Sequence, residues 1–408
     1  MTNPLLKRAR SDILKMLPYS SARSMHKVVP GSIFLDANEC PFEPYLGAEN
    51  LAVYPEQQPE TLIQGLSKLY DVSTRNLVIT RGADEAIEVL IRTFCISNKD
   101  NIIICPPTFA MYSHSAAIHG VKVKEVPLLK TFELDIDNIK ATSDKNTKLI
   151  FLCSPNNPTG NLMNVEKILT LCEWLKDHAV VVVDETYIEF AGESRSIIPH
   201  LENMSNLVVI RTLSKAYAAA GIRCGVSISH SDIASLIKKI LPPYPIPQTV
   251  VHAVVKLLVP ENLNRLDRKR YELLDRKDTF IQKLRLIDEV EEIYPSDTNY
   301  VLVKFVNSSS LIKRCISNNI FIRDLSHQSA LKNCVRISIG NDEDMTRLLA
   351  TIQNKKIPKV SDARMSSIHR VTSETSVTVQ INLDEQEPVN INTGIGFYDH
   401  MLEQVAKH

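Results

Sequence analysis

The stretch Arg211-Thr-Leu-Ser-Lys-Ala-Tyr-Ala-Ala-Ala-Gly-Ile-Arg-Cys-Gly225 indicates both the fold and the chemistry of this chain. It follows the apolar run Leu207 to Ile210, which is typical of a buried strand. A lysine at a strand exit can be partly desolvated, which lowers its pKa and makes its amine a nucleophile toward carbonyl groups. The side chains that could hold a phosphate beside Lys215 are Thr212, Ser214 and Arg223. Pyridoxal phosphate needs such an amine next to a phosphate site, whereas the alternative is a surface lysine at a helix start.

Two further segments place polar residues at strand ends. Ser154-Pro-Asn-Asn-Pro-Thr-Gly160 follows the apolar run Leu149 to Cys153, and in Ala179-Val-Val-Val-Val-Asp-Glu-Thr-Tyr187 an apolar run ends at Asp184. Ligands bind at the carboxyl ends of strands in open α/β sheets. A carboxylate at the tip of a buried strand is costly without a partner, and a protonated pyridine nitrogen would be one. A turn or a helix cap explains each segment alone, but three such segments in order favour a cofactor site.

The wider pattern predicts an α/β fold. Apolar runs of strand type alternate with helical patterns between residues 77 and 229, which predicts a mostly parallel, seven-stranded sheet between helices. The expected strands are Leu77–Thr80, Asn101–Cys105, Val121–Val126, Leu149–Cys153, Val180–Val183, Leu207–Ile210 and Gly225–Ile228. A charged helix, Leu263 to Leu286, should then lead to a smaller α+β domain. Its expected parts are the strands Asn299–Phe305 and Val335–Ile339 and a helix near Ser310 to Ser317.

The composition excludes several classes of protein. The chain has 408 residues, enough for more than one domain, and its 47 Lys and Arg balance its 47 Asp and Glu. This balance gives no reason to expect a nucleic acid or an anionic membrane as partner. The apolar runs are too short for a transmembrane helix, and the first 23 residues lack an apolar signal core. Eight cysteines without a Cys-x-x-Cys pair are typical of a reducing compartment, so we expect a cytoplasmic protein.

The ordered motifs closely resemble the fold-type I aminotransferases, and specifically the histidinol-phosphate aminotransferase family, from about Ile13 to about Lys356. The other segments that carry the resemblance are Leu35–Glu39, Tyr54–Pro55, Thr80–Glu88, Pro106–Phe109, Phe321–Asp324 and Cys334–Gly340. The resemblance implies the PLP fold type I, pyridoxal 5'-phosphate as cofactor and a homodimer. It also implies transamination between glutamate and imidazole acetol phosphate, which gives 2-oxoglutarate and histidinol phosphate in histidine biosynthesis.

The same resemblance implies a role for each catalytic and ring-binding residue. Lys215 would bind the cofactor's aldehyde covalently and then shuttle a proton between Cα of the substrate and C4′ of the cofactor. Asp184 would keep the pyridine nitrogen protonated, so that the ring can accept electrons. Asn157 and Tyr187 would donate hydrogen bonds to the ring's 3-oxygen, and Phe109 would stack on the ring.

The remaining implied residues bind the phosphate or the substrate. The N–H groups of Ala83 and Asp84 would open a helix at the phosphate, beside Ser214, Thr212 and Arg223, while Tyr54 would reach it from a neighbouring subunit. Arg336 would pair with the α-carboxylate of the amino donor. Arg323 and Tyr19 would face the other end of the substrate, and Asn38 would lie near the entrance. A solvated surface charge is the plain alternative for both arginines.

Three alternative functions stay open from the sequence. Relatives that decarboxylate a phosphorylated amino acid share Lys215, Asp184 and the arginines, so the motifs separate this reaction poorly from transamination. An aromatic amino-acid aminotransferase is a second alternative. A non-catalytic module that keeps the fold is a third, although the intact cofactor residues oppose it.

The pattern changes near Gln353 and predicts a further domain. Residues His369 to Leu383 alternate like one strand, Val389 to Ile391 would form a second, and a helix begins near Phe397, which gives a β-β-α fragment. This tail resembles the first part of imidazoleglycerol-phosphate dehydratase, which implies that Glu374 contacts substrate and that His400 binds one of two manganese ions. The family's later metal-binding segments are absent. We therefore expect no metal site and no dehydratase activity.

The expected boundaries follow from these changes. Residues 1–45 would form an N-terminal segment that joins the small domain, 46–250 the large cofactor-binding domain, and 251–353 the small domain. Residues 354–365 would form a linker, and residues 366–408 a truncated dehydratase-like fragment. A truncated bifunctional protein and a misread frame both explain the fragment.

Overall fold

The computed structural model describes residues 6, 8–17, 42, 51–355, 365–371, 374–383 and 389–407. The chain divides into two compact units, residues 1–354 and residues 355–408. The predicted site residues Tyr19 and Asn38 lie outside the described residues.

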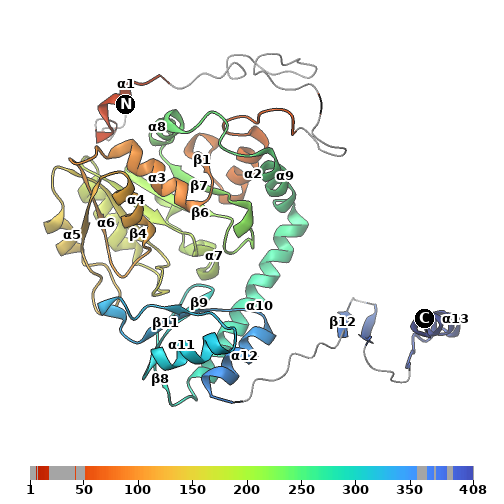
Figure 1. The fold of residues 1–408 in the computed structure, drawn as a ribbon. Coiled ribbons are helices and arrows are strands. Elements are labelled where there is room, and N and C mark those ends of the chain that lie inside the picture. The colour runs from red at the N-terminus through yellow and green to blue at the C-terminus, as the bar shows by residue number, and fades with distance from the viewer. Residues whose placement is uncertain are drawn as a thin grey trace. The chain divides into compact units, whose positions relative to one another are not determined.

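The first unit contains the expected seven-stranded sheet (Figure 1). Its strands are β1 Leu77–Thr80, β2 Asn101–Ile104, β3 Lys122–Glu125, β4 Thr147–Cys153, β5 Val180–Asp184, β6 Leu207–Thr212 and β7 Gly225–Ser229. They lie in the order β1-β7-β6-β5-β4-β2-β3. Strands β2 to β6 pair in parallel, whereas β7 runs antiparallel to both β1 and β6. The predicted fold is confirmed.

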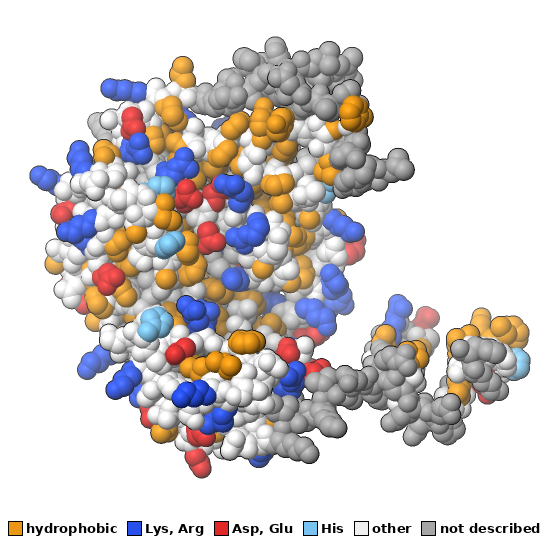
Figure 2. All heavy atoms as spheres, in the orientation of Figure 1, with side chains coloured by type: hydrophobic (Ala, Val, Ile, Leu, Met, Phe, Trp, Pro, Cys, Tyr) orange, Lys and Arg blue, Asp and Glu red, His pale blue; other side chains and the backbone are white. Residues whose placement is uncertain are grey.

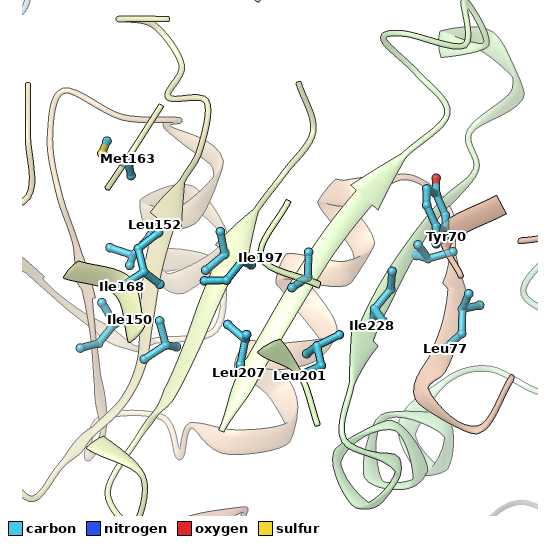
Figure 3. Packing of buried hydrophobic residues seen from close by; sticks show 14 of the residues in the cluster. Tyr70, Leu77, Ile150, Leu152, Met163, Ile168, Ile197, Leu201, Leu207 and Ile228 are labelled. Atoms are coloured by element: carbon cyan, nitrogen blue, oxygen red, sulfur yellow. The ribbon is translucent and has the colours of Figure 1, made fainter. Parts of the chain in front are cut away.

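Helices cover both faces of this sheet because its central strands are apolar on both sides. In β4, Ile150 and Leu152 pack into one buried cluster, and Leu149 and Phe151 pack into the other. Figure 3 shows the first cluster, in which side chains from neighbouring strands meet in one apolar layer. The helices of this part are α1 Ser11–Lys15, α2 Glu60–Tyr70, α3 Ala83–Phe94, α4 Met111–Ile118, α5 Ile136–Thr142, α6 Val165–Leu175, α7 Ile188–Ala191, α8 Ser231–Ile240 and α9 Gln248–Leu257.

The long helix α10, Pro260–Leu284, leads from this layer to a second, antiparallel sheet (Figure 1). That sheet has the order β10-β11-β9-β8. Its elements are β8 Val290–Ile293, β9 Tyr300–Phe305, α11 Ser308–Ser317, β10 Arg323–Asp324, β11 Cys334–Ser338 and α12 Asp342–Ile352. Strands β8 and β10 were not predicted, because they are short edge strands without a buried apolar run. The short 3₁₀ helices of the unit are η3 Thr74–Asn76, η4 Glu193–Arg195, η5 Ile198–His200, η6 Ala220–Ile222 and η7 Ser329–Leu331.

The second unit is a hairpin followed by a helix. Strands β12 Met365–Val371 and β13 Ser376–Asn382 pair antiparallel, and α13 spans Gly396–Lys407. The prediction of a single strand from His369 to Leu383 is therefore wrong. The chain reverses between the two strands, so each can pair its backbone groups with the other. The predicted strand Val389 to Ile391 is also wrong, because these residues are not in a strand.

Candidate active site

The carboxyl ends of β4, β5 and β6 lie level with one another. Cys153 pairs with Asp184, and Asp184 pairs with Ile210 in the next strand. Because parallel strands carry their polar exits to the same edge, the three motifs meet there. They surround a cavity of about 360 Å³. It is lined by Ala83, Asp84, Thr108, Phe109, Ala110, Cys153, Asn157, Pro158, Asp184, Thr186, Tyr187, Thr212, Ser214, Lys215, Arg223, Arg323, Leu325, Gln328 and Arg336.

Most of the predicted site residues meet at this cavity. The predicted residues in its lining are Ala83, Asp84, Phe109, Asn157, Asp184, Tyr187, Thr212, Ser214, Lys215, Arg223, Arg323 and Arg336. Tyr54 is not among the lining residues. Its ring stacks on that of Tyr244, with centroids 4.4 Å apart, and it is about half exposed.

Lys215 lies in the turn after β6, where two arginines and the protein interior surround its amine. Burial lowers the pKa of Lys215, and the positive charges of Arg336 and Arg223 lower it further. Its Nζ lies 5.8 Å from the centroid of the Tyr187 ring. Near neutral pH, a larger fraction of such a lysine is unprotonated than of a solvated lysine. The unprotonated amine is the form that attacks a carbonyl group.

Asp184 is the last residue of β5 and is 2 % exposed. Its Oδ1 accepts hydrogen bonds from the backbone N–H of Thr186, at 3.1 Å, and from the Thr186 hydroxyl, at 2.6 Å. Its Oδ2 accepts a hydrogen bond from the Tyr112 hydroxyl at 2.8 Å. Burial raises the pKa of Asp184, and these donors oppose the increase because they favour the charged form.

The start of α3 forms a corner of the cavity with Arg223. Arg223 Nη2 lies 3.3 Å from Asp84 Oδ2, and Arg223 Nη1 lies 3.5 Å from Ser214 Oγ. Gly82 precedes the helix with φ +84°, and a Cβ at this position would lie 2.7 Å from Arg223 Nη2. The helix N-terminus and the guanidinium therefore present positive charge at one place, which favours an anion such as a phosphate.

Arginines of the small sheet line the other side of the cavity. Arg323 in β10 and Arg336 in β11 are register partners, so both reach the same region. Arg336 Nη1 donates a hydrogen bond to Asn157 Oδ1 at 2.5 Å, and its guanidinium carbon lies 5.2 Å from the centroid of the Tyr300 ring. Arg336 is thus held between the two sheets, whereas Arg323 is exposed.

A buried ionic cluster lies directly beside this strand edge. Arg211, in β6, is completely buried and contacts Glu185 at 3.2 Å, Glu189 at 2.9 Å and Glu193 at 3.0 Å. Glu185 and Glu189 are buried as well. Burial raises the pKa of Glu189 to about 7; the charge of Arg211 opposes this rise, and the charge of Glu193 adds to it. Arg211 precedes Lys215 by four residues and Glu185 follows Asp184, so the cluster ties together the two strand ends that carry them.

Sequence reasoning missed several residues at the site. Thr186 and Cys153 line the cavity and lie inside the same strand-end motifs as Asp184 and Asn157, so the sequence pattern does point to their positions. Leu325 and Gln328 lie between β10 and η7, where no periodic pattern points to a site. No sequence pattern marked Tyr112 as part of the site, because a tyrosine within a helix is usually a packing residue.

Other features of the described residues do not compete with this site. A larger cavity of about 630 Å³ is lined by residues that include Tyr70 and Tyr217, but neither Lys215 nor Asp184 lines it. No group of three or more His, Cys, Asp or Glu side chains among the described residues could hold a metal ion. Among the helices that the structure describes, none has the length and apolar character needed to cross a bilayer. Charges of both signs are interspersed on the face shown in Figure 2.

The comparisons with known proteins agree with this geometry. Residues 36–352 match the family model "Aminotransferase class I and II". Histidinol-phosphate aminotransferase 1 of Haemophilus influenzae (strain 86-028NP) is 39 % identical over 350 residues, which cover 85 % of this chain and 98 % of that protein. Histidinol-phosphate aminotransferase of Blochmanniella floridana is 37 % identical, with 85 % and 97 % covered.

Solved structures give the same result. The histidinol-phosphate aminotransferase of Clostridium acetobutylicum superposes with a TM-score of 0.68 at 27 % identity, covering 75 % of this chain and 91 % of that one. The enzyme of Sinorhizobium meliloti, solved in complex with pyridoxal-5'-phosphate, shares the fold with a TM-score of 0.67 at 24 % identity, covering 75 % and 83 %. The strand order, the residues at the cavity and these likenesses together show that the chain belongs to the histidinol-phosphate aminotransferase family of the class I and II aminotransferases.

Proposed function

We propose that this chain is a pyridoxal-phosphate-dependent transaminase that exchanges an amino group between glutamate and imidazole acetol phosphate. The products are 2-oxoglutarate and histidinol phosphate, and the reaction is reversible. The observation that carries the proposal is the single cavity lined by Lys215, Asp184 and Arg336. The names of the relatives, and the cofactor in the Sinorhizobium meliloti structure, support it.

The residues present fit pyridoxal phosphate. Asp184 is a buried carboxylate that lines a cavity, and such a group is costly unless a cation balances it. A protonated pyridine nitrogen supplies that cation. The corner formed by α3, Ser214 and Arg223 suits the phosphate, and the Lys215 amine suits the aldehyde. Phe109 would stack on the ring, while Asn157 and Tyr187 would hold its 3-oxygen.

The side chains of the cavity would each have a separate role in the reaction. When bound, pyridoxal phosphate supplies the electron sink that stabilises a carbanion at the α-carbon of the amino acid. The Lys215 amine, whose pKa is lowered, would carry a proton from that α-carbon to C4′ of the cofactor, and in the opposite direction in the second half-reaction. Asp184 holds the ring nitrogen in its protonated form. Arg223 and the N-terminus of α3 fix the phosphate, which keeps the reacting atoms beside Lys215.

Arg336 and Arg323 would select the substrates. Arg336 is suited to a bidentate contact with the α-carboxylate of glutamate. Its hydrogen bond to Asn157 fixes the guanidinium before substrate binds. Arg323 and Tyr19 would meet the far end of the substrate, a carboxylate in glutamate and a phosphate in the other substrate. Asn38 would lie near the entrance.

We also propose a cytoplasmic homodimer. Tyr54 does not line the cavity of its own subunit and is about half exposed, which supports its reaching the phosphate of a partner. The seven cysteines among the described residues are buried and form no disulfide, which suits a reducing compartment.

The proposed domains are residues 46–250 for cofactor binding and 251–353 for the small domain, with residues 354–365 as a linker. The prediction that residues 1–45 join the small domain does not hold for α1, because Ala9 and Ile13 pack into the buried cluster of the large sheet and α8. Residues 366–408 would be a fragment related to imidazoleglycerol-phosphate dehydratase. In it, only Thr375 separates Glu374 from the start of β13, and His400 is exposed in α13. Of these two residues His400 alone is a candidate metal ligand, and a catalytic metal needs about three protein ligands, so we propose that residues 366–408 hold no metal by themselves.

Two half-reactions test the proposed function. Glutamate should convert the bound cofactor to its amine form, and imidazole acetol phosphate should restore the aldehyde form, as followed by absorbance. Conversion with an aromatic 2-oxo acid but not with the phosphorylated ketone would reject the substrate assignment. Release of carbon dioxide from a phosphorylated amino acid, without cofactor interconversion, would instead support a decarboxylase.

A further inference from the structure

Tyr112 connects two residues of the proposed cofactor site without lining the cavity. It lies in α4 and is completely buried. Its hydroxyl donates a hydrogen bond to Asp184 Oδ2 at 2.8 Å. Its ring contacts Phe109 edge to face, with centroids 5.7 Å apart. One side chain therefore supports both the carboxylate expected at the ring nitrogen and the aromatic ring expected to stack on the cofactor.

The orientation of Tyr112 is fixed by packing. Its ring stacks on Phe151 of β4, with centroids 4.9 Å apart and planes 14° apart. Phe151 lies beside Val182 in the sheet, two residues before Asp184. Because the ring is held between Phe109 and Phe151, the hydroxyl cannot swing away from the carboxylate without repacking the core.

The chemistry of this pair favours an ionised Asp184. Burial raises the pKa of Tyr112 well above its usual value, so the phenol stays protonated and donates. A donor to a carboxylate stabilises the charged form and opposes the effect of burial. Tyr112 and Thr186 each occupy one carboxylate oxygen, which fixes the plane of the group. Asp84 and Lys215 are charged groups that also interact electrostatically with Asp184.

We propose that Tyr112 is a positioning residue that keeps the Asp184 carboxylate ionised and oriented toward the place where the ring nitrogen of the cofactor binds. The inference rests on the proposed cofactor site. It extends that site to a residue which reaches the cofactor only through Asp184 and Phe109.

Tyr112→Phe tests the hydroxyl while it keeps the ring. A hydrogen bond to a charged group is lost, so we expect the dissociation constant for pyridoxal phosphate to rise roughly ten- to hundredfold. The thermal unfolding midpoint of the cofactor-free protein should change only slightly, so that the main effect is on cofactor affinity. Tyr70→Phe is the matched control, because Tyr70 is also buried and its hydroxyl has no hydrogen-bond partner among the described residues. That control should bind the cofactor within about twofold of the original protein.

A double-mutant cycle with Asp184→Asn separates positioning from general stability. If Tyr112 acts through the charge of Asp184, Tyr112→Phe should cost little further cofactor affinity in the Asp184→Asn background. An equal loss in both backgrounds, or no loss in Tyr112→Phe alone, overturns the inference. A failure of the original protein to bind pyridoxal phosphate would instead overturn the proposed function, so the two failures are distinguishable.

Discussion

Burial has opposite effects on the two central residues of the candidate site: it lowers the pKa of Lys215 and raises that of Asp184. Both residues stand at or just after an apolar run, and a charged residue in that position needs a partner, which made them visible in the sequence. Tyr112 and Gln328 could not be found in this way. Their importance depends on which side chains the fold brings near them, and a single sequence does not contain that information.

Gly82 lies at the start of α3, beside Arg223, in the corner of the cavity where we propose that the phosphate of the cofactor binds. We expect Gly82→Ala to weaken cofactor binding at least tenfold, because φ +84° disfavours a side chain and the new Cβ would displace the Arg223 guanidinium. Gly221→Ala is the control, since a Cβ there meets no atom within 4 Å. Titration with pyridoxal phosphate measures both. Equal affinity in the two variants would contradict the proposed phosphate corner.

Glu189 should make stability depend on pH. Its pKa is raised from 4.5 to about 7 in the folded protein, so the folded state binds the proton more tightly than the unfolded chain. Its contribution to stability is therefore full below pH 4.5 and is lost as the pH rises through about 7, a change on the order of 1–3 kcal/mol.

Glu189→Gln removes this titration and retains much of the shape. Urea unfolding at pH 5.5 and pH 8 should show a smaller loss of stability on raising the pH in the variant than in the original protein. The same pH dependence in both proteins would mean that Glu189 does not titrate in this range.

At the scale of elements, the seven strands of the large sheet were predicted because each is a short apolar run between helical patterns. The short edge strands β8 and β10 were missed, since β8 carries Glu291 and Glu292 and β10 has only two residues. The hairpin β12–β13 was mistaken for one strand. Its alternation continues on both sides of the turn, so the pattern alone does not reveal where the chain reverses.

Helix α12 offers a test of an element's own signals. Asn341 and Asp344 form a reciprocal capping box at its start. We expect Asn341→Ala to lower the free energy of unfolding by about 1 kcal/mol, because a backbone N–H loses its partner. Cofactor affinity should not change. Urea unfolding and a cofactor titration measure the two quantities, and a large effect on binding would show that α12 is coupled to the cavity.

At the scale of the whole molecule, the first unit contains its own sheets, cores and cavity. The change in pattern near Gln353 predicts that a further domain follows the first unit. The sequence alone does not show whether the stability or cofactor binding of one unit depends on the other. The described apolar side chains of the second unit are largely exposed, including Ile368, Val377 and Phe397.

A chain that ends at Asn354 should therefore keep cofactor binding and transamination within about twofold of the full chain. Its thermal unfolding midpoint should also be similar, because among the described residues no apolar cluster of the first unit includes one beyond Ile352. Loss of binding in the shortened chain would show that the second unit supports the site.

The attachment of the cofactor to one amine can be measured directly. The protein loaded with pyridoxal phosphate is reduced with borohydride and its peptides are measured by mass spectrometry. We expect a phosphopyridoxyl group on Lys215 in the original protein and no stoichiometric label on any residue of Lys215→Ala. A stoichiometric label on another lysine, or none on the original protein, would contradict the assignment of this cavity as the active site.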